Sequence, residues 1–298
     1  MTRGQETLVK GGIGAITVLV CANVALSFGG WFVRLADVGP VAAAWWRMGL
    51  AAPALFLIAR AVATKDFATE QKSPAPLREV RVWLPLLLCG LFFAADLAAW
   101  HLGLLQTKLA NANLLGNAAS FLFPIYGFFI AKSWPSRTQG LALLLAAVGS
   151  VLLMGRSYEL SPAHLIGDLL CLLAGVCYMI FLILVDRIRG TMGVWSLHAW
   201  TTLASAIPLL AAAILLQEQI MPTNWTPIIL LTFGSQIIGQ SLLLLVIGRL
   251  SPLVIGLALL LQPIISALVG YYAYAETMGP LDWAGAALIA IALLLVRR

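Results

Sequence analysis

The sequence WPSRTQGLALLLAA, at residues 134–147, returns in altered form as GPLDWAGAALIAIA at residues 279–292. Proline is the second residue of both stretches, and Gly140 matches Gly285 at a spacing of 145 residues. Similarity at a fixed spacing is typical of a chain built from copies of one structural unit. The match therefore predicts that the C-terminal end of the chain repeats a segment near its middle.

Weaker matches extend the repeat toward the start of each unit. A shift of 144 places Asp96 on Gln240, and a shift of 155 places Trp45 on Trp200. These matches keep the same order along the chain, although apolar sequence makes chance similarity easy. The predicted units are residues 1–155 and residues 156–298.

The composition predicts that lipid surrounds most of the chain. Of the 298 residues, 61% are hydrophobic and 10% are charged, and the mean hydropathy is +0.97. A water-soluble domain of this length does not show this balance. The net charge of +6 does not indicate nucleic-acid binding, because the basic residues lie in short segments between apolar runs. Membrane lipids are their expected partners.

Ten apolar runs are candidates for membrane-spanning helices, each of which needs about 20 residues. They cover residues 13–34, 41–62, 82–106, 110–131, 138–155, 164–185, 194–217, 226–247, 252–274 and 281–296. The predicted fold is an all-α polytopic membrane protein.

The basic residues predict how these spans are oriented, because cytoplasmic loops carry the excess of Lys and Arg. With a cytoplasmic N-terminus, fourteen of the 18 basic residues fall on inner segments. Three fall on outer segments, namely Arg34, Lys108 and Arg156. We expect both termini to be cytoplasmic, and the connection at about residues 63–81 to be a cytoplasmic loop.

The odd number of spans in each unit has a functional consequence. A second copy of five helices enters the membrane from the opposite side, which gives the inverted repeat of many secondary transporters. We therefore predict alternating access through a central cavity. A membrane-embedded enzyme or a channel remains the alternative, although the chain has no HExxH or GxSxG sequence and no repeated selectivity filter.

The sequence also resembles the drug/metabolite transporter superfamily of the EamA type. The resemblance rests on ALSFGGWFVRL at residues 25–35, GPVAAAWWRMGLAA at residues 39–52, and QPIISALVGYYAYAETMGPLDWAGAALI from Gln262. It implies ten helices in two five-helix repeats. The first half departs from the pattern, because Ala131 stands where the second half has Glu276.

Within that superfamily the first two spans and the aromatic content most resemble the YddG-type exporters. This resemblance implies export of aromatic and other apolar amino acids across a bacterial inner membrane. The alternative within the same fold is export of other metabolites or drugs. The motifs that are missing from the sequence also lead us to expect no enzymatic activity, no cofactor and no metal. The expected partners are the small-molecule substrate and lipids, and the expected unit is a monomer.

Polar and aromatic side chains in the middle of spans are the candidates for a binding site, because polar groups that face lipid are costly. The predicted substrate-binding residues are Asn23, Ser27, Trp31, Asp96, Trp100, Asn113, Asn117, Phe121, Tyr178, Gln236 and Gln240. Each has a structural alternative. The amides and hydroxyls can hydrogen-bond between helices, Tyr178 can fill the core, and Asp96 can pair with Arg47.

Other residues have expected roles that are mainly structural. We favour a structural role over gating for Arg47, an interfacial position for His101, and a turn-capping role for Glu276 over one at the rim of the exit. For Gln262 and Ser266 we favour core packing. The histidines and cysteines have no spacing typical of a zinc site.

Overall fold

A computed structural model describes residues 3–66, 80–107, 109–155, 162–274 and 278–296. All named elements in these ranges are helical. The first half contains α1 (Arg3–Ser27), α2 (Gly29–Leu35), α3 (Pro40–Asp66), α4 (Val80–Gln106), α5 (Leu109–Gly116), α6 (Ala119–Ala131) and α7 (Arg137–Gly155). The second half contains η1 (Pro162–His164), α8 (Leu165–Ile188), α9 (Val194–Leu215), α10 (Trp225–Leu230), η2 (Leu231–Gln240), α11 (Ser241–Val246), α12 (Pro252–Leu259), α13 (Leu261–Tyr274) and α14 (Pro280–Val296).

The helices lie at the positions of the predicted spans, but they differ in length. Eight helical segments in the described ranges are long and apolar enough to cross a membrane. Two further apolar helices, at Arg137–Leu153 and Pro280–Val296, are shorter. The all-helical membrane class is confirmed, and the count of ten spans stays a prediction.

The outer surface of the bundle is apolar, as a lipid-facing surface must be. Leu57, Phe129 and Leu215 are 71%, 79% and 82% exposed. Patches of this kind are rare on soluble proteins because water does not tolerate them. The surface is therefore suited to hydrocarbon.

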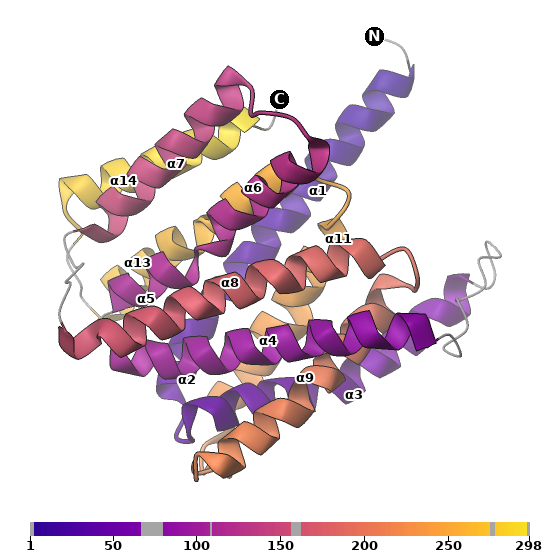
Figure 1. Cartoon of the computed structure of the whole chain (residues 1–298), viewed down its shortest axis with the longest axis vertical. Helices are drawn as coiled ribbons and strands as arrows, with labels where there is room; N and C mark the ends of the chain where they lie inside the picture. Colours follow the sequence, from indigo (N-terminus) through magenta and orange to yellow (C-terminus); the bar gives the residue numbers. More distant parts are fainter. Residues whose placement is uncertain (1–2, 67–79, 108, 156–161, 275–277, 297–298) are drawn as a thin grey trace.

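The extensive helix contacts join one half of the chain to the other. Helix α4 packs along α8, α3 along α9 and α7 along α14, while α6 contacts α12 and α1 contacts η2. Figure 1 shows α7 beside α14 at the upper left, and α8 beside α4 across the middle. The two halves interlock and do not form two separate bundles.

Glycine allows α7 and α14 to approach closely. A Cβ atom on Gly285 would lie 2.5 Å from the carbonyl oxygen of Gly149, and one on Gly149 would lie 2.7 Å from that of Gly285. Small residues commonly permit such contacts between membrane helices. Gly140, which the sequence aligned with Gly285, has no atom within 4 Å of its Cβ position. The aligned glycines therefore do not share a packing role.

Candidate functional site

Three of the predicted spans are broken where a cavity of about 140 Å³ lies. The breaks separate α1 from α2 at Phe28, α5 from α6 at Asn117 and Ala118, and α12 from α13 at Leu260. Residues on both sides of each break line the cavity. Irregular backbone at membrane depth is tolerated only inside the protein or beside a cavity, and transporters use such breaks around their substrate sites.

Local sequence explains two of the breaks. The run Phe28–Gly29–Gly30 places two glycines where α1 ends, and glycine costs about 1 kcal/mol in a helix interior. Pro263 is the third residue of α13, and it cannot donate the backbone hydrogen bond that would continue α12 through Leu260.

A fourth irregularity borders the cavity in the second half. Residues Leu231–Gln240 form a π-helix, η2, and its last residue, Gln240, lines the cavity. π-Helical turns are rare and frequently occur at functional sites.

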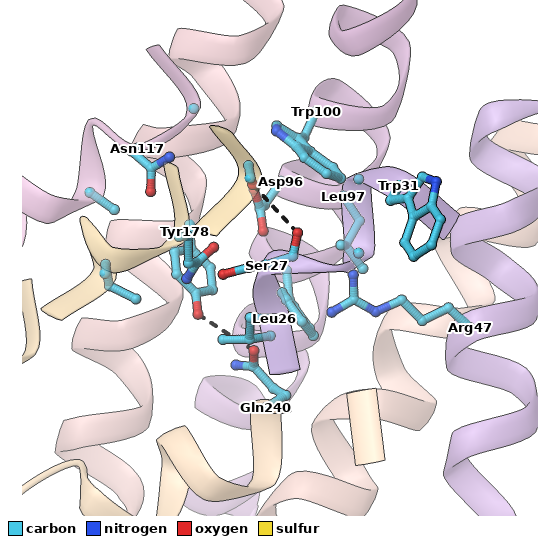
Figure 2. Close-up of a pocket in the computed structure, with 18 of the residues that line it drawn as sticks. Leu26, Ser27, Trp31, Arg47, Asp96, Leu97, Trp100, Asn117, Tyr178 and Gln240 are labelled. Carbon is cyan, nitrogen blue, oxygen red and sulfur yellow. Dashed lines mark hydrogen bonds between the residues drawn. The ribbon is translucent and has the colours of Figure 1, made fainter. Parts of the chain in front are cut away.

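The cavity wall carries many of the predicted residues. Figure 2 shows residues from both halves around one space, with the Arg47 side chain reaching toward the others from α3. The predicted residues on the wall are Ser27, Trp31, Arg47, Asp96, Trp100, Asn117, Tyr178 and Gln240. The structure brings these residues together, and their role in substrate binding stays a prediction.

The charged groups of the wall include Arg47 and Asp96. No ion pair within 4.0 Å joins them in the part of the chain that the structure describes. Arg47 instead donates from Nε to Gln236 Oε1 at 3.1 Å. Arg47 and Asp96 therefore attract each other across the cavity without a direct contact.

Gln236 lies behind the wall and not on it. Its Nε2 is 3.1 Å from His198 Nε2 and donates to the Thr202 hydroxyl at 3.1 Å. His198 Nδ1 is 2.9 Å from the Ser241 hydroxyl. This buried network fixes Gln236, which in turn holds Arg47 against the cavity.

Trp100 is held in place by two glycines. A Cβ atom on Gly30 would lie 3.3 Å from the edge of its indole, and one on Gly116 would lie 3.0 Å from Cδ1. Glycine at both positions makes room for the ring between α2 and α5. Trp31 packs against Phe28 and Phe32 at ring-centroid distances of 6.3 and 5.6 Å. Two indoles therefore border the cavity.

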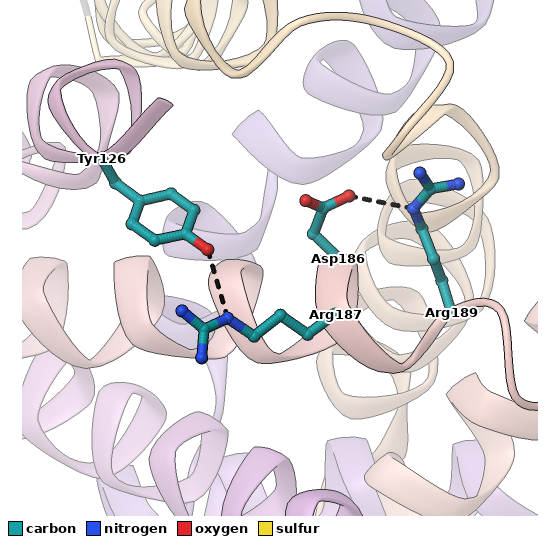
Figure 3. A network of polar contacts seen from close by, with 4 residues as sticks. All are labelled: Tyr126, Asp186, Arg187 and Arg189. Carbon is teal, nitrogen blue, oxygen red and sulfur yellow. Dashed lines mark hydrogen bonds and ion pairs between the residues drawn. The ribbon is translucent and has the colours of Figure 1, made fainter. Parts of the chain in front are cut away.

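Two aromatic residues on the wall, Phe93 and Tyr178, pack with Phe181. Phe93 stacks on Phe181 at 4.5 Å between ring centroids, and Tyr178 lies 5.9 Å from Phe181. Nearer the end of α8, Arg187 Nε donates to the Tyr126 hydroxyl at 3.2 Å, and Arg189 Nε donates to Asp186 at 2.9 Å (Figure 3). By the predicted orientation this end faces the cytoplasm.

Two acidic residues tie helices together at the opposite end. Glu218 accepts hydrogen bonds from the backbone N–H groups of Val41 and Ala42 at the start of α3. Asp37 accepts from the hydroxyl and backbone N–H of Thr223 and from the N–H of Asn224. The hydrogen bond from the Thr223 hydroxyl, with the two from backbone N–H groups, lowers the pKa of the Asp37 carboxyl.

Three further predicted residues have other surroundings. Asn23 donates to the Leu19 carbonyl and accepts from Gln262, so it supports the wall from behind, as Gln236 does. His101 is buried with Nδ1 at 2.7 Å from the Pro40 carbonyl oxygen at the start of α3, and its interfacial position stays a prediction. Phe121 packs into the cluster formed by α7, α12 and α14.

Two predicted positions cannot be placed. The side chain of Asn113 and the whole of Glu276 lie outside the described residues.

The sequence interpretation missed part of the wall. Gln262 and Ser266, expected to pack in the core, line the cavity from α13, as does Arg34 from α2. The spacing of four between Gln262 and Ser266, directly beside Pro263, could have indicated a polar face next to a helix break.

A comparison with protein families gives a match for the second half of the chain. Residues 165–298 match the EamA-like transporter family. This stretch is similar to that family and makes up less than half of the chain.

Solved structures share the fold of the whole chain. A structure titled "Crystal structure of protein" superposes with a TM-score of 0.75 at 17% identity, over 98% of this chain and 99% of that one. At this identity the likeness concerns the fold alone. No curated protein matches the sequence significantly. In the described residues no group of three or more His, Cys, Asp or Glu side chains is arranged to hold a metal ion.

Proposed function

We propose that the chain is a secondary transporter that exports small amphipathic metabolites, chiefly aromatic and other apolar amino acids, by alternating access. The observation that carries this proposal is the polar and aromatic cavity between the two halves, at the breaks of three spans. Broken helices supply backbone groups and flexible joints at membrane depth, which a carrier needs and a purely structural bundle does not.

The pattern of helix contacts also supports this mechanism. The pairs α3 with α9, α6 with α12 and α7 with α14 each join spans that the repeat makes equivalent. The contact of α4 with α8 and that of α1 with η2 are likewise equivalent under the repeat. An inverted two-fold arrangement produces pairs of this kind, and it permits one half to rock against the other.

The cavity favours a small solute. Pockets for drug-sized ligands usually measure about 300–1,000 Å³, and this cavity measures about 140 Å³. Its indoles and its amides suit a solute with one aromatic or aliphatic part and one polar part. In our proposal the unit is a monomer in a bacterial inner membrane, with both termini cytoplasmic.

Reconstituted protein provides the test. Liposomes that contain the purified protein are loaded with labelled phenylalanine. The release of label is measured in exchange for external phenylalanine, and unlabelled aromatic amino acids, methionine, threonine and cationic dyes are tested as inhibitors of this exchange. We expect saturable exchange that aromatic and apolar amino acids inhibit. Folded protein that moves none of these solutes would overturn the proposal, and exchange inhibited by dyes alone would replace amino acids with drugs as the substrate class.

A further inference from the structure

Arg47 presents unused hydrogen-bond donors to the cavity. The side chain is only 5% exposed, and its one hydrogen bond to any described residue uses Nε. A guanidinium carries five N–H donors, so the four on the terminal nitrogens have no such partner. Arg47 lines the cavity, and hydrogen bonds from a charged donor are stronger than those between neutral groups. These donors are therefore suited to an anionic ligand.

Gln240 provides a second unused donor on the same wall. Its Oε1 accepts a hydrogen bond from the Tyr178 hydroxyl at 3.4 Å, while its buried Nε2 has no hydrogen-bond partner. The amide is 1% exposed, so water does not readily replace the missing acceptor. An amide donor and a guanidinium on one cavity wall suit a carboxylate, because arginine matches its two oxygens with a planar fork.

Asp96 supplies the opposite charge. It lines the same cavity from α4, and it makes no hydrogen bond or ion pair with any residue that the structure describes. An ionised carboxylate accepts hydrogen bonds only, so its natural ligand is a cationic donor such as an ammonium group. The cavity wall thus carries one charged group suited to an anion and one suited to a cation.

We propose that the site recognises a zwitterion, with Arg47 and Gln240 binding the substrate carboxylate and Asp96 binding its ammonium group. This inference rests on the proposed transport function and narrows its substrate class to solutes that carry both groups. The apolar part of the substrate lies against the indoles of Trp31 and Trp100. Arg47 is then a specificity-determining residue, in contrast to the structural role that the sequence suggested.

Analogues of phenylalanine test the two charges separately. Phenylalaninamide keeps the ammonium group, 3-phenylpropionate keeps the carboxylate, and phenylalanine has both. Competition against labelled phenylalanine is measured in proteoliposomes at about pH 6, where an α-amino group is protonated. We expect each single-charge analogue to compete at least about 30-fold more weakly than phenylalanine, since a site built for a polar group rejects a ligand that lacks it.

Variants assign each charge to its residue. Arg47→Gln is expected to reduce the difference between phenylalanine and phenylalaninamide to less than about threefold, and Asp96→Asn is expected to do the same for 3-phenylpropionate. The matched control is Arg187→Gln, which removes an exposed arginine outside the cavity and should keep the wild-type differences. If Arg47→Gln does not fold, the wild-type analogue series still decides.

The outcomes separate this inference from the proposed function. Equal competition by phenylalanine and phenylalaninamide, with phenylalanine still transported, overturns the zwitterion site and leaves amino-acid export standing. Absence of phenylalanine transport in folded protein overturns the proposed function itself. If Arg47→Gln and Asp96→Asn both keep the wild-type differences between phenylalanine and its analogues, other residues bind the two charged groups and the assignment is wrong.

Discussion

The two halves of the chain build one cavity but supply different chemistry to it. The first half provides Arg34, Arg47 and Asp96, while the second half provides neutral groups, namely Tyr178, Gln240, Gln262 and Ser266. Asp96 and Gln240 stand at matching positions of the predicted repeat. The comparison teaches that a repeat can preserve the shape of a site while one copy alone keeps its charges, which gives a bound solute one preferred orientation.

The halves also differ in where their helices are irregular. The break between α5 and α6 has a counterpart between α12 and α13, at matching spans of the repeat. The break between α1 and α2 has none, because α8 runs without interruption from Leu165 to Ile188. We infer that the first span and η2 provide flexibility that their counterparts lack.

The largest effect is expected from removing the charge that distinguishes the halves. Asp96→Asn should slow phenylalanine exchange at least about tenfold, because hydrogen bonds to charged groups contribute about 1.5–3 kcal/mol. Gln240→Asn withdraws a neutral amide and should slow exchange only about two- to fivefold. Initial exchange rates in proteoliposomes measure both. Equal effects would show that the copies contribute equally, and Asp186→Asn, outside the cavity, should stay within about twofold of wild type.

A smaller effect is expected from crowding Trp100. In Gly116→Ala the new Cβ would lie 3.0 Å from Cδ1 and 3.2 Å from Nε1 of the indole, so the ring must shift. We expect KM for phenylalanine to rise severalfold with little change in protein yield. Gly140→Ala is the matched control, because nothing lies within 4 Å of that Cβ position. A normal KM in the Gly116 variant would remove Trp100 from the substrate site.

The contact between α7 and α14 should affect stability and not transport. Gly149→Ala places a Cβ atom 2.7 Å from the Gly285 carbonyl oxygen, and overpacking of this kind typically costs about 1–3 kcal/mol. Thermal unfolding in detergent should therefore begin several degrees lower. Neither helix lines the cavity, so exchange per folded molecule should match wild type. A large loss of exchange would place this helix pair in the moving machinery.

The smallest effect is expected at the end of α8. Tyr126→Phe removes the hydrogen bond from Arg187, in a partly exposed position where such bonds contribute about 1 kcal/mol or less. The exchange rate should change by less than about threefold. A tenfold change would identify this contact as a latch that holds the inner side closed.

The sequence predicted the helical membrane class and the approximate positions of the spans, because long apolar runs have few other stable structures in lipid. It could not predict which helix face borders the cavity. Asn117 and Phe121 share one face of an unbroken helix, but α5 ends before Asn117, and Phe121 consequently lies elsewhere. Apolar residues suit both lipid and protein core, so the periodicity that marks a buried face in water is weak here.

The polar residues of the site could be predicted only in part from the sequence, for a related reason. Asp96 stood out because an acid within an apolar run is costly. Gln262 and Ser266 looked like ordinary contacts between helices, and their place on the cavity depends on the break at Leu260. The partners of Arg47 also depend on a distant element, because Gln236 reaches it from η2.

Accessibility of the cavity from the two sides of the membrane is the most direct test of the account. Ser266→Cys, in protein whose four native cysteines have been replaced, is treated in right-side-out and inside-out vesicles with a thiol reagent that cannot cross the membrane. We predict labelling from both sides, slowed on each side by phenylalanine. Labelling from one side alone under every condition, or labelling that phenylalanine does not slow, would contradict alternating access through this cavity.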